Sequence, residues 1–502
     1  MSAAELLSPS LEPVPTGVPN LDDVLAGGYA ARRLHLIEGQ PGTGKTTLGL
    51  QFLMAGRDAG ESVLYVTLSE TKEELLQSAA THGWSLDGIE LCELAPPELT
   101  MDPSHEQTVV YSSDLELGET ISTVMDVLQR LRPTRLVFDS AAEIRLLSQT
   151  PLRYRRQILA LKHTIAQLGC TALLLDDLTQ QQDPTSLHSL AHGVIHLEQI
   201  ALQYGAERRR IRVSKMRGRQ FRGGFHDFAL RKGGMMIFPR LVASEHMAVG
   251  DSEPAVSGVA ELDALLGGGL DRGTSSLILG PSGSGKSTLA LGWIYAALGR
   301  GERVLLVCFD ETLQVMLRRA AGIGMTLSPH IESGLLCVEQ VDPAELTPGE
   351  LSGIVRRHVE AGARAVVLDS LSGYQNAMPE EVFLTLQMHE LLTYLGNKGV
   401  LTILILAQHG LVGQMQTSVD LTYISDTVLL LRFFEAAGEI RRALSVLKKR
   451  TGRHESFIRE FRIDGGGVRV GPVLEQFQGV LTGVPTYSGA SATLLRTRRN
   501  GD

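Results

Sequence analysis

Paired cysteines and long apolar runs are missing from this chain of 502 residues, and we expect no signal peptide. Its four cysteines, Cys92, Cys170, Cys308 and Cys337, lie in apolar surroundings without C-x-x-C spacing, so we expect reduced core thiols rather than disulfides or a metal site. No apolar run approaches the length of a membrane span. The first residues have neither a basic n-region nor an apolar h-region. These absences predict a soluble, cytoplasmic protein without a membrane partner.

An excess of positive charge is missing as well. The formal net charge is −9, which disfavours a surface built throughout for nucleic acid. Apolar residues make up 43% of the chain and charged residues 21%, a composition typical of globular proteins. The length exceeds what one hydrophobic core sustains, so we expect two or three domains.

The sequence instead contains an internal duplication. Several motifs recur in the same order, separated by nearly constant spacing. The matching segments are 16–28 and 257–269, 39–47 and 280–288, 139–140 and 369–370, and 215–217 and 448–450. Each half alternates continuous apolar runs, typical of strands buried on both faces of a parallel sheet, with helical stretches. The halves are therefore two copies of one α/β domain.

Each half carries the phosphate-loop motif G-x-x-x-x-G-K-[ST] between a predicted strand and a predicted helix. In such loops, backbone N–H groups and the helix N-terminus bind the phosphates of ATP. We expect Lys45 and Lys286 to contact the β- and γ-phosphates, and the hydroxyls of Thr46 and Ser287 to ligate Mg²⁺. The candidate nucleotide-binding residues are Gly42, Thr43, Gly44, Lys45, Thr46 and Thr47 in the first copy, and Gly283, Ser284, Gly285, Lys286, Ser287 and Thr288 in the second.

These motifs predict an α/β fold with two tandem RecA-like P-loop NTPase domains, each a mostly parallel sheet flanked by helices. We expect the first domain at 1–242, a linker at 243–256, the second domain at 257–484 and a mobile C-terminal tail at 485–502.

Carboxylates follow the predicted strands at positions suited to metal binding and catalysis. Asp139 and Asp369 end apolar strands, where a carboxylate holds Mg²⁺; the alternative is that each caps a turn. Glu70 and Glu311 follow the second strand of each copy and are candidates to orient or deprotonate the attacking water. Asp310 adds a carboxylate in the second copy. The alternative for the glutamates is a solvated acidic helix cap.

A basic segment at 207–222 has a counterpart near 441–453. The alternation in this segment is typical of a strand, with Lys215 and Arg217 on one face. Three interpretations remain open: a solvated face, a nucleic-acid groove, or cations inserted into the ATP site of a neighbouring subunit.

The chain resembles the KaiC family over nearly its whole length, from Gly17 to about Gly489. The resemblance includes both phosphate loops, both Asp-Ser strand ends and the segments 425–430, 438–443, 458–461 and 479–485. It implies a homohexamer of two stacked rings with ATP at subunit interfaces. It also implies nucleotide contacts supplied from an adjacent subunit by Lys215, Arg217, Lys448 and Arg450, and second-site contacts by Arg442 and His454.

The chain departs from the family pattern in three respects. Glu70 and Glu311 match the second member of its catalytic Glu-Glu pair, whereas Ser69 and Asp310 replace the first. Ile323 stands where the family has an adenine-stacking tryptophan. Thr422 and Tyr423 replace its Ser-Thr phosphorylation pair, leaving Thr422 as the candidate phosphoacceptor.

We therefore expect a hexameric ATPase that signals its nucleotide state to a protein partner and has candidate Ser/Thr autokinase activity in the second domain. Two other functions stay open. One is a RecA-like nucleic-acid-dependent ATPase of the motor or recombination type, although the sequence has no separate DNA-binding module and no aromatic-rich single-strand channel. The other is a nucleotide-gated scaffold with almost no turnover.

Overall fold

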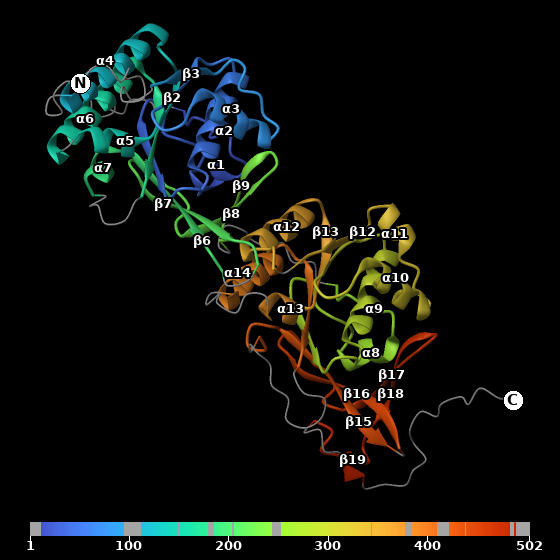
Figure 1. Ribbon diagram of the computed structural model, residues 1–502. Coiled ribbons are helices and arrows are strands. Elements are labelled where there is room, and N and C mark those ends of the chain that lie inside the picture. The colour runs from blue at the N-terminus through green and yellow to red at the C-terminus, as the bar shows by residue number, and fades with distance from the viewer. Residues whose placement is uncertain are drawn as a thin grey trace, which may run out of the picture. The chain divides into compact units, whose positions relative to one another are not determined.

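The computed structural model describes residues 12–94, 112–148, 150–178, 185–202, 205–242, 253–342, 344–376, 384–408, 421–436, 438–481 and 486–487. The chain divides into two compact units, one extending to Arg240 and the other beginning at Leu241, with 204–206 grouped with the second (Figure 1). Within the described residues, no helix combines the length and the apolar character needed to cross a membrane.

The first unit is built on a nine-stranded sheet in the order β3-β2-β4-β5-β1-β6-β7-β8-β9. The first six strands of that order pair in parallel, and the remaining three pair antiparallel. The strands are β1 (Leu34–Gly39), β2 (Val63–Thr67), β3 (Glu90–Glu93), β4 (Arg135–Asp139), β5 (Thr171–Asp177), β6 (Gly193–Ile200), β7 (Arg208–Met216), β8 (Phe225–Arg231) and β9 (Gly234–Phe238).

Helices cover both faces of this sheet. They are α1 (Leu21–Val24), α2 (Lys45–Asp58), α3 (Lys72–Thr81), α4 (Ser112–Leu131), α5 (Ala141–Leu147), α6 (Pro151–Leu168) and α7 (Thr185–Leu190). Successive β1 side chains enter different cores: Leu36 lies in the cluster that includes Ile158 of α6, and Ile37 in the one that includes Leu48 of α2. This explains why the parallel strands are continuous apolar runs.

The second unit repeats the topology in the order β12-β11-β13-β14-β10-β15-β16-β17-β18. Its strands are β10 (Ser275–Gly280), β11 (Arg303–Cys308), β12 (Leu336–Gln340), β13 (Ala363–Asp369), β14 (Leu401–Ala407), β15 (Thr427–Ala436), β16 (Glu439–Lys449), β17 (Arg459–Asp464) and β18 (Gly467–Val473). Its helices are α8 (Ala260–Leu265), α9 (Lys286–Gly299), α10 (Leu313–Gly322), α11 (Ser328–Glu332), α12 (Pro348–Glu360), α13 (Leu371–Asn376) and α14 (Leu384–Asn397). The predicted fold class, two tandem RecA-like domains, is confirmed.

The ends of the expected linker and tail carry some structure. Ala255, at the end of the expected linker, is buried and bridges to Leu270; residues 243–252 lie outside the described residues. Within the expected tail, β20 (Thr486–Tyr487) pairs with β19 (Phe477–Gln478), and residues 488–502 lie outside the described residues. All four cysteines are free thiols.

Candidate nucleotide sites

The first phosphate loop connects β1 to α2 at the carboxyl edge of the sheet. Gly42 and Gly44 adopt positive φ values of 81° and 98°, which a residue with a Cβ rarely takes. The ammonium group of Lys45 donates to the carbonyls of Gly39 and Gln40 at 3.0 and 2.9 Å. The same group lies 2.5 Å from Oδ1 of Asp177, at the end of β5. Asp177 therefore holds the lysine where phosphate oxygens are expected.

Two candidate metal ligands, Thr46 and Asp139, lie next to each other beside this loop. The Thr46 hydroxyl donates to Oδ2 of Asp139 at 3.2 Å, and the hydroxyl of Tyr65, on β2, donates to the same oxygen at 2.6 Å. Burial raises the pKa of Asp139, while these two hydrogen bonds oppose the rise. A hydroxyl and a carboxylate are oxygen ligands of the kind Mg²⁺ prefers, so the residues present fit that ion. The Asp139–Ser140 peptide bond is cis, as is Asp369–Ser370.

Glu70 lies half-buried between β2 and α3, at the same sheet edge. Burial, followed by the nearby carboxylates of Asp139, Glu74 and Asp177, raises its pKa. Helix α3 is capped by other residues: the Thr71 hydroxyl accepts from the Glu74 amide, and the Glu74 carboxylate accepts from the Thr71 amide. The cap function therefore belongs to Thr71 and Glu74. Glu70 is left as a carboxylate close enough to Asp139, the candidate metal ligand, for the two to repel each other.

The second phosphate loop has the same backbone but a different partner for its lysine. Gly283 and Gly285 have φ values of 75° and 100°, and Lys286 donates to the Pro281 carbonyl at 2.8 Å. The strand register that places Asp177 opposite Gly39 places Ala407 opposite Gly280. Lys286 thus has a methyl group where Lys45 has a carboxylate, and burial lowers the pKa of Lys286 to about 8.

The other predicted loop residues and metal ligands occupy matching places. Thr43 is buried with its hydroxyl donating to the Gln40 carbonyl, whereas the buried Ser284 hydroxyl has no partner in the described part of the chain. Ser287 hydrogen-bonds Asp369, and this bond opposes the rise in the pKa of Asp369 that burial causes. Thr47, in the first turn of α2, is half-buried.

The two catalytic candidates of the second site are both bound to neighbouring side chains. Oδ2 of Asp310 accepts a hydrogen bond of 2.7 Å from Ser370. Arg319, on α10, binds both oxygens of Glu311, with N···O distances of 2.5 and 3.1 Å, and lies 3.4 Å from the Thr288 hydroxyl. Measured from the N-caps Thr71 and Thr312, the position of Arg319 in α10 corresponds to Ser78 in α3.

The predicted trans-acting cations of the first domain lie at the end of the parallel strands that is opposite to the phosphate loop of the same domain. Lys215 pairs with Val194 near the start of β6, whereas Gly39 of the loop pairs with Leu197 further along that strand. Lys215 donates to the carbonyls of His188 and Ala191, and Arg217 to that of Ser189 at 2.8 Å. These three carbonyls lie at the end of α7 and just after it.

The second domain repeats this arrangement. Lys448 donates to the carbonyls of Thr422 and Ser425 at 2.9 and 2.7 Å. Arg450 donates to the carbonyl of Tyr423 at 2.5 Å and to Oδ1 of Asp426 at 3.3 Å. The segment that carries the candidate phosphoacceptor is therefore fastened by the two predicted trans-acting cations.

Arg442 and His454 are both half-buried on or just after β16. The guanidinium of Arg442 lies 5.8 Å from the centre of the Phe433 ring. Within the described residues, neither side chain hydrogen-bonds the phosphate loop of its own domain.

The sequence marks Asp177, at the end of an apolar run, as a possible γ-phosphate sensor, but it predicts neither the ion pair of Asp177 with Lys45 nor the participation of Tyr65 and Arg319. Asp177 has this signal because β1, β2 and β4 also end next to candidate site residues. The other two had none, since each is chosen by a contact across the fold.

Comparisons with known proteins identify the family of this chain. A family model described as KaiC ATPase matches residues 14–242 and 255–475. The circadian clock protein KaiC3 of Synechocystis is 27% identical over 489 residues, which cover 96% of each chain. The circadian clock oscillator protein KaiC of Thermostichus vulcanus is 26% identical over 500 residues, 97% of this chain and 94% of that protein. That of Synechococcus elongatus is 25% identical over 501 residues, 97% and 95% respectively.

Proposed function

The chain belongs to the KaiC ATPase family, and we propose that it assembles as a homohexameric double ring that binds and hydrolyses ATP at both of its domains. In this proposal each nucleotide lies at a subunit interface. The phosphate loop comes from one subunit and the cations of the opposite sheet edge from the next.

Within one first-domain site, the residues divide the work of phosphoryl transfer. Lys45 exchanges Asp177 for the β- and γ-phosphates, and Thr46 and Asp139 hold Mg²⁺, which neutralises charge on the phosphates. Glu70 orients or deprotonates the attacking water, and its raised pKa suits a general base. In the second site, Lys286, Ser287, Asp369 and Glu311 take the same roles.

One observation carries the ring proposal. Lys215 and Arg217 lie at the opposite edge of the sheet from Gly39, and Lys448 and Arg450 repeat this placement relative to Gly280. Three residues of β6, from Val194 to Leu197, separate the two positions in the first domain, about 10 Å at the rise of a parallel strand. The cations therefore face away from the loop of their own chain, and a neighbouring subunit's phosphates are the natural target. Arg442 and His454 are assigned to the second nucleotide site on the family resemblance alone.

We propose a further activity for the second domain, autophosphorylation at Thr422. Its main chain is fixed by Lys448, so the acceptor segment and a trans-acting cation move as one unit. In a ring, this unit would face the γ-phosphate of the adjacent subunit, where Asp310 or Glu311 would orient the Thr422 hydroxyl.

Size-exclusion chromatography with light scattering tests the proposal, with and without Mg-ATP, on the wild type and on Arg217→Ala/Arg450→Ala. We expect ATP to promote a hexamer, and the double variant to lose hydrolysis and assembly together. A monomer that hydrolyses ATP at the wild-type rate would refute the interface site. Single-stranded DNA should leave the rate unchanged, whereas stimulation would favour the nucleic-acid-dependent alternative.

A further inference from the structure

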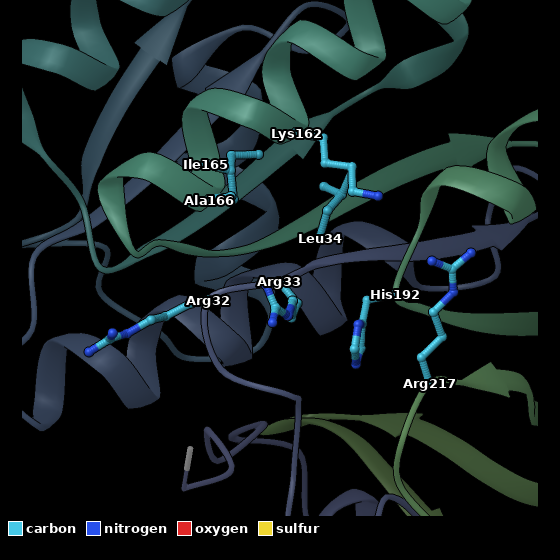
Figure 2. Close-up of a pocket in the computed structure, with 8 residues that line it drawn as sticks. All are labelled: Arg32, Arg33, Leu34, Lys162, Ile165, Ala166, His192 and Arg217. Atoms are coloured by element: carbon cyan, nitrogen blue, oxygen red, sulfur yellow. The ribbon is translucent and has the colours of Figure 1, made fainter. Parts of the chain in front are cut away.

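A strongly basic cavity of about 280 Å³ opens in the first domain, between the start of β1 and helix α6 (Figure 2). Figure 2 shows Lys162 on the helix above His192 and Arg217, with the side chain of Arg32 directed away from them. The lining residues are Arg32, Arg33, Leu34, Lys162, Ile165, Ala166, His192 and Arg217. No carboxylate is among them.

The charges of this cavity are uncompensated. Within the described part of the chain, Arg33, Lys162 and Arg217 form no ion pair with a carboxylate. Lys162 and Arg217 are instead held by main-chain carbonyls, those of Leu190 at 2.7 Å and Ser189 at 2.8 Å. Burial lowers the pKa of Lys162 and of His192, and repulsion from Arg217 and Arg33 lowers both further. The fold thus holds like charges together at an energetic cost.

The second domain shows that this cost is not required by the fold. Two backbone hydrogen bonds identify the equivalent positions of the two domains. The N–H of His192 donates to the Leu34 carbonyl, and the His192 carbonyl accepts from the N–H of Arg217. Asp426 makes the same two bonds, with Ser275 and Arg450. His192 therefore corresponds to Asp426, and Arg217 to Arg450.

The charges themselves are replaced in the second domain. Thr274 precedes the first residue of β10 as Arg33 precedes the first residue of β1, so Thr274 occupies the position of Arg33. Lys162 lies seven residues before Gly169, which follows α6, and Leu392 lies seven residues before Gly399, which follows α14. Leu392 therefore occupies the position of Lys162. Arg450 lies 3.3 Å from Asp426, which neutralises it. A neutral, ion-paired version of this region therefore folds, and the basic version belongs to the first domain alone.

We propose that this cavity is a binding site for a small phosphate-bearing anion, inorganic phosphate or pyrophosphate, distinct from both phosphate loops of the chain. A phosphate group suits three convergent cations, because planar guanidinium forks bind its oxygens in pairs and an ammonium adds a point charge. Arg217 connects this site to the proposed subunit interface, so a bound anion would compete with the neighbour's nucleotide for that side chain. Binding itself does not require the ring.

Isothermal titration calorimetry tests the proposal, with pyrophosphate titrated into the full chain carrying Lys45→Ala and Lys286→Ala to weaken both phosphate loops. We expect one site per chain that weakens with added salt. Adding Arg33→Thr and Lys162→Leu, the residues of the second domain, should weaken it about tenfold for each lost cation. Arg33→Thr alone should show the first step even if Lys162→Leu impairs folding, because Arg33 is exposed. Arg32→Gly is the matched control: it also removes a cation, but one directed away from the cluster, and should leave binding unchanged.

Two outcomes would overturn the site. One is equal pyrophosphate affinity with and without Arg33→Thr. The other is that the cavity binds only ATP, and only in the assembled wild type, while the Lys45→Ala/Lys286→Ala chain binds no pyrophosphate. The anion would then be the neighbour's nucleotide. Neither result depends on whether the ring hydrolyses ATP, which the chromatography and activity measurements report separately.

Discussion

Arg319 binds both carboxylate oxygens of Glu311, the residue proposed to activate water in the second ATP site. Glu70, its counterpart in the first site, has Ser78 at the position of that arginine and is surrounded by carboxylates instead. The two copies therefore present the same candidate base in opposite electrostatic surroundings. Arg319 occupies both oxygens of Glu311, which are then not free to contact water, so the second site should turn over more slowly than the first.

Arg319→Ser, which copies the first domain, should increase ATP hydrolysis at the second site several-fold, because Glu311 becomes free to contact water. Phosphate release by a Lys45→Ala chain measures this site alone. The ion pair is one-quarter exposed, so its loss should cost at most about 1 kcal/mol of stability. Arg318→Ser removes an exposed cation from the same helix and should leave the rate unaltered. A slower Arg319→Ser enzyme would instead make the arginine a catalytic cation.

Glu70→Gln should reduce first-site turnover by about 10²–10⁴-fold, the usual contribution of a general base. The base works in its ionised form and its pKa is raised, so wild-type turnover should fall as the pH drops through that raised value. Rates of a Lys286→Ala chain between pH 5 and pH 8 measure both effects. Because Glu74 rather than Glu70 caps α3, thermal melting should be little changed. A Glu70→Gln chain that retains the wild-type rate would assign water activation to another group.

Nucleotide affinity at the second site should fall as the pH rises through about 8, where Lys286 loses its proton in the nucleotide-free protein. Only the ammonium form provides charge-assisted contacts to phosphate. Titrating a fluorescent ATP analogue into Lys45→Ala protein from pH 7 to 9.5 measures this. Ala407→Asp recreates the carboxylate found next to Lys45, and it should raise the pKa of Lys286 and move the loss of affinity to higher pH. Ala407→Asn is the neutral control, and an inflection shared by both variants would contradict the assignment.

The local parts of this architecture could be predicted from the sequence because each depends on a pattern of consecutive residues. A buried parallel strand is a continuous apolar run, and a phosphate loop is a fixed spacing of glycines before a lysine. The duplication then gave two independent copies of each signal. This is why the α/β class, the paired RecA-like domains and the phosphate loops were predictable.

The electrostatic differences between the sites were not readable, because they depend on contacts across the fold. Whether Glu311 is free depends on a helix residue eight positions later, and whether Lys45 is paired depends on the end of β5. The carbonyl partners of Lys215 and Arg217 are equally long-range. The resemblance gave these cations a target in a neighbouring subunit but not their partners within the chain.

Incubation with Mg-ATP should place at most one phosphate on each chain, at Thr422. Its neighbour Tyr423 is 58% exposed and carries a phenol further from the backbone than a serine or threonine hydroxyl, and in-line transfer tolerates misplacement of only about 1 Å. Ser425, the next hydroxyl, is fully buried and donates to the Leu421 carbonyl at 3.0 Å, which removes it as a substitute. Intact-mass spectrometry measures the stoichiometry, and Thr422→Ala should abolish the modification while hydrolysis persists. Tyr423→Phe is the matched control and should keep the single phosphate. A doubly phosphorylated chain, or a phosphate that survives Thr422→Ala, would show that acceptor choice here does not follow from the placement of the aliphatic hydroxyl.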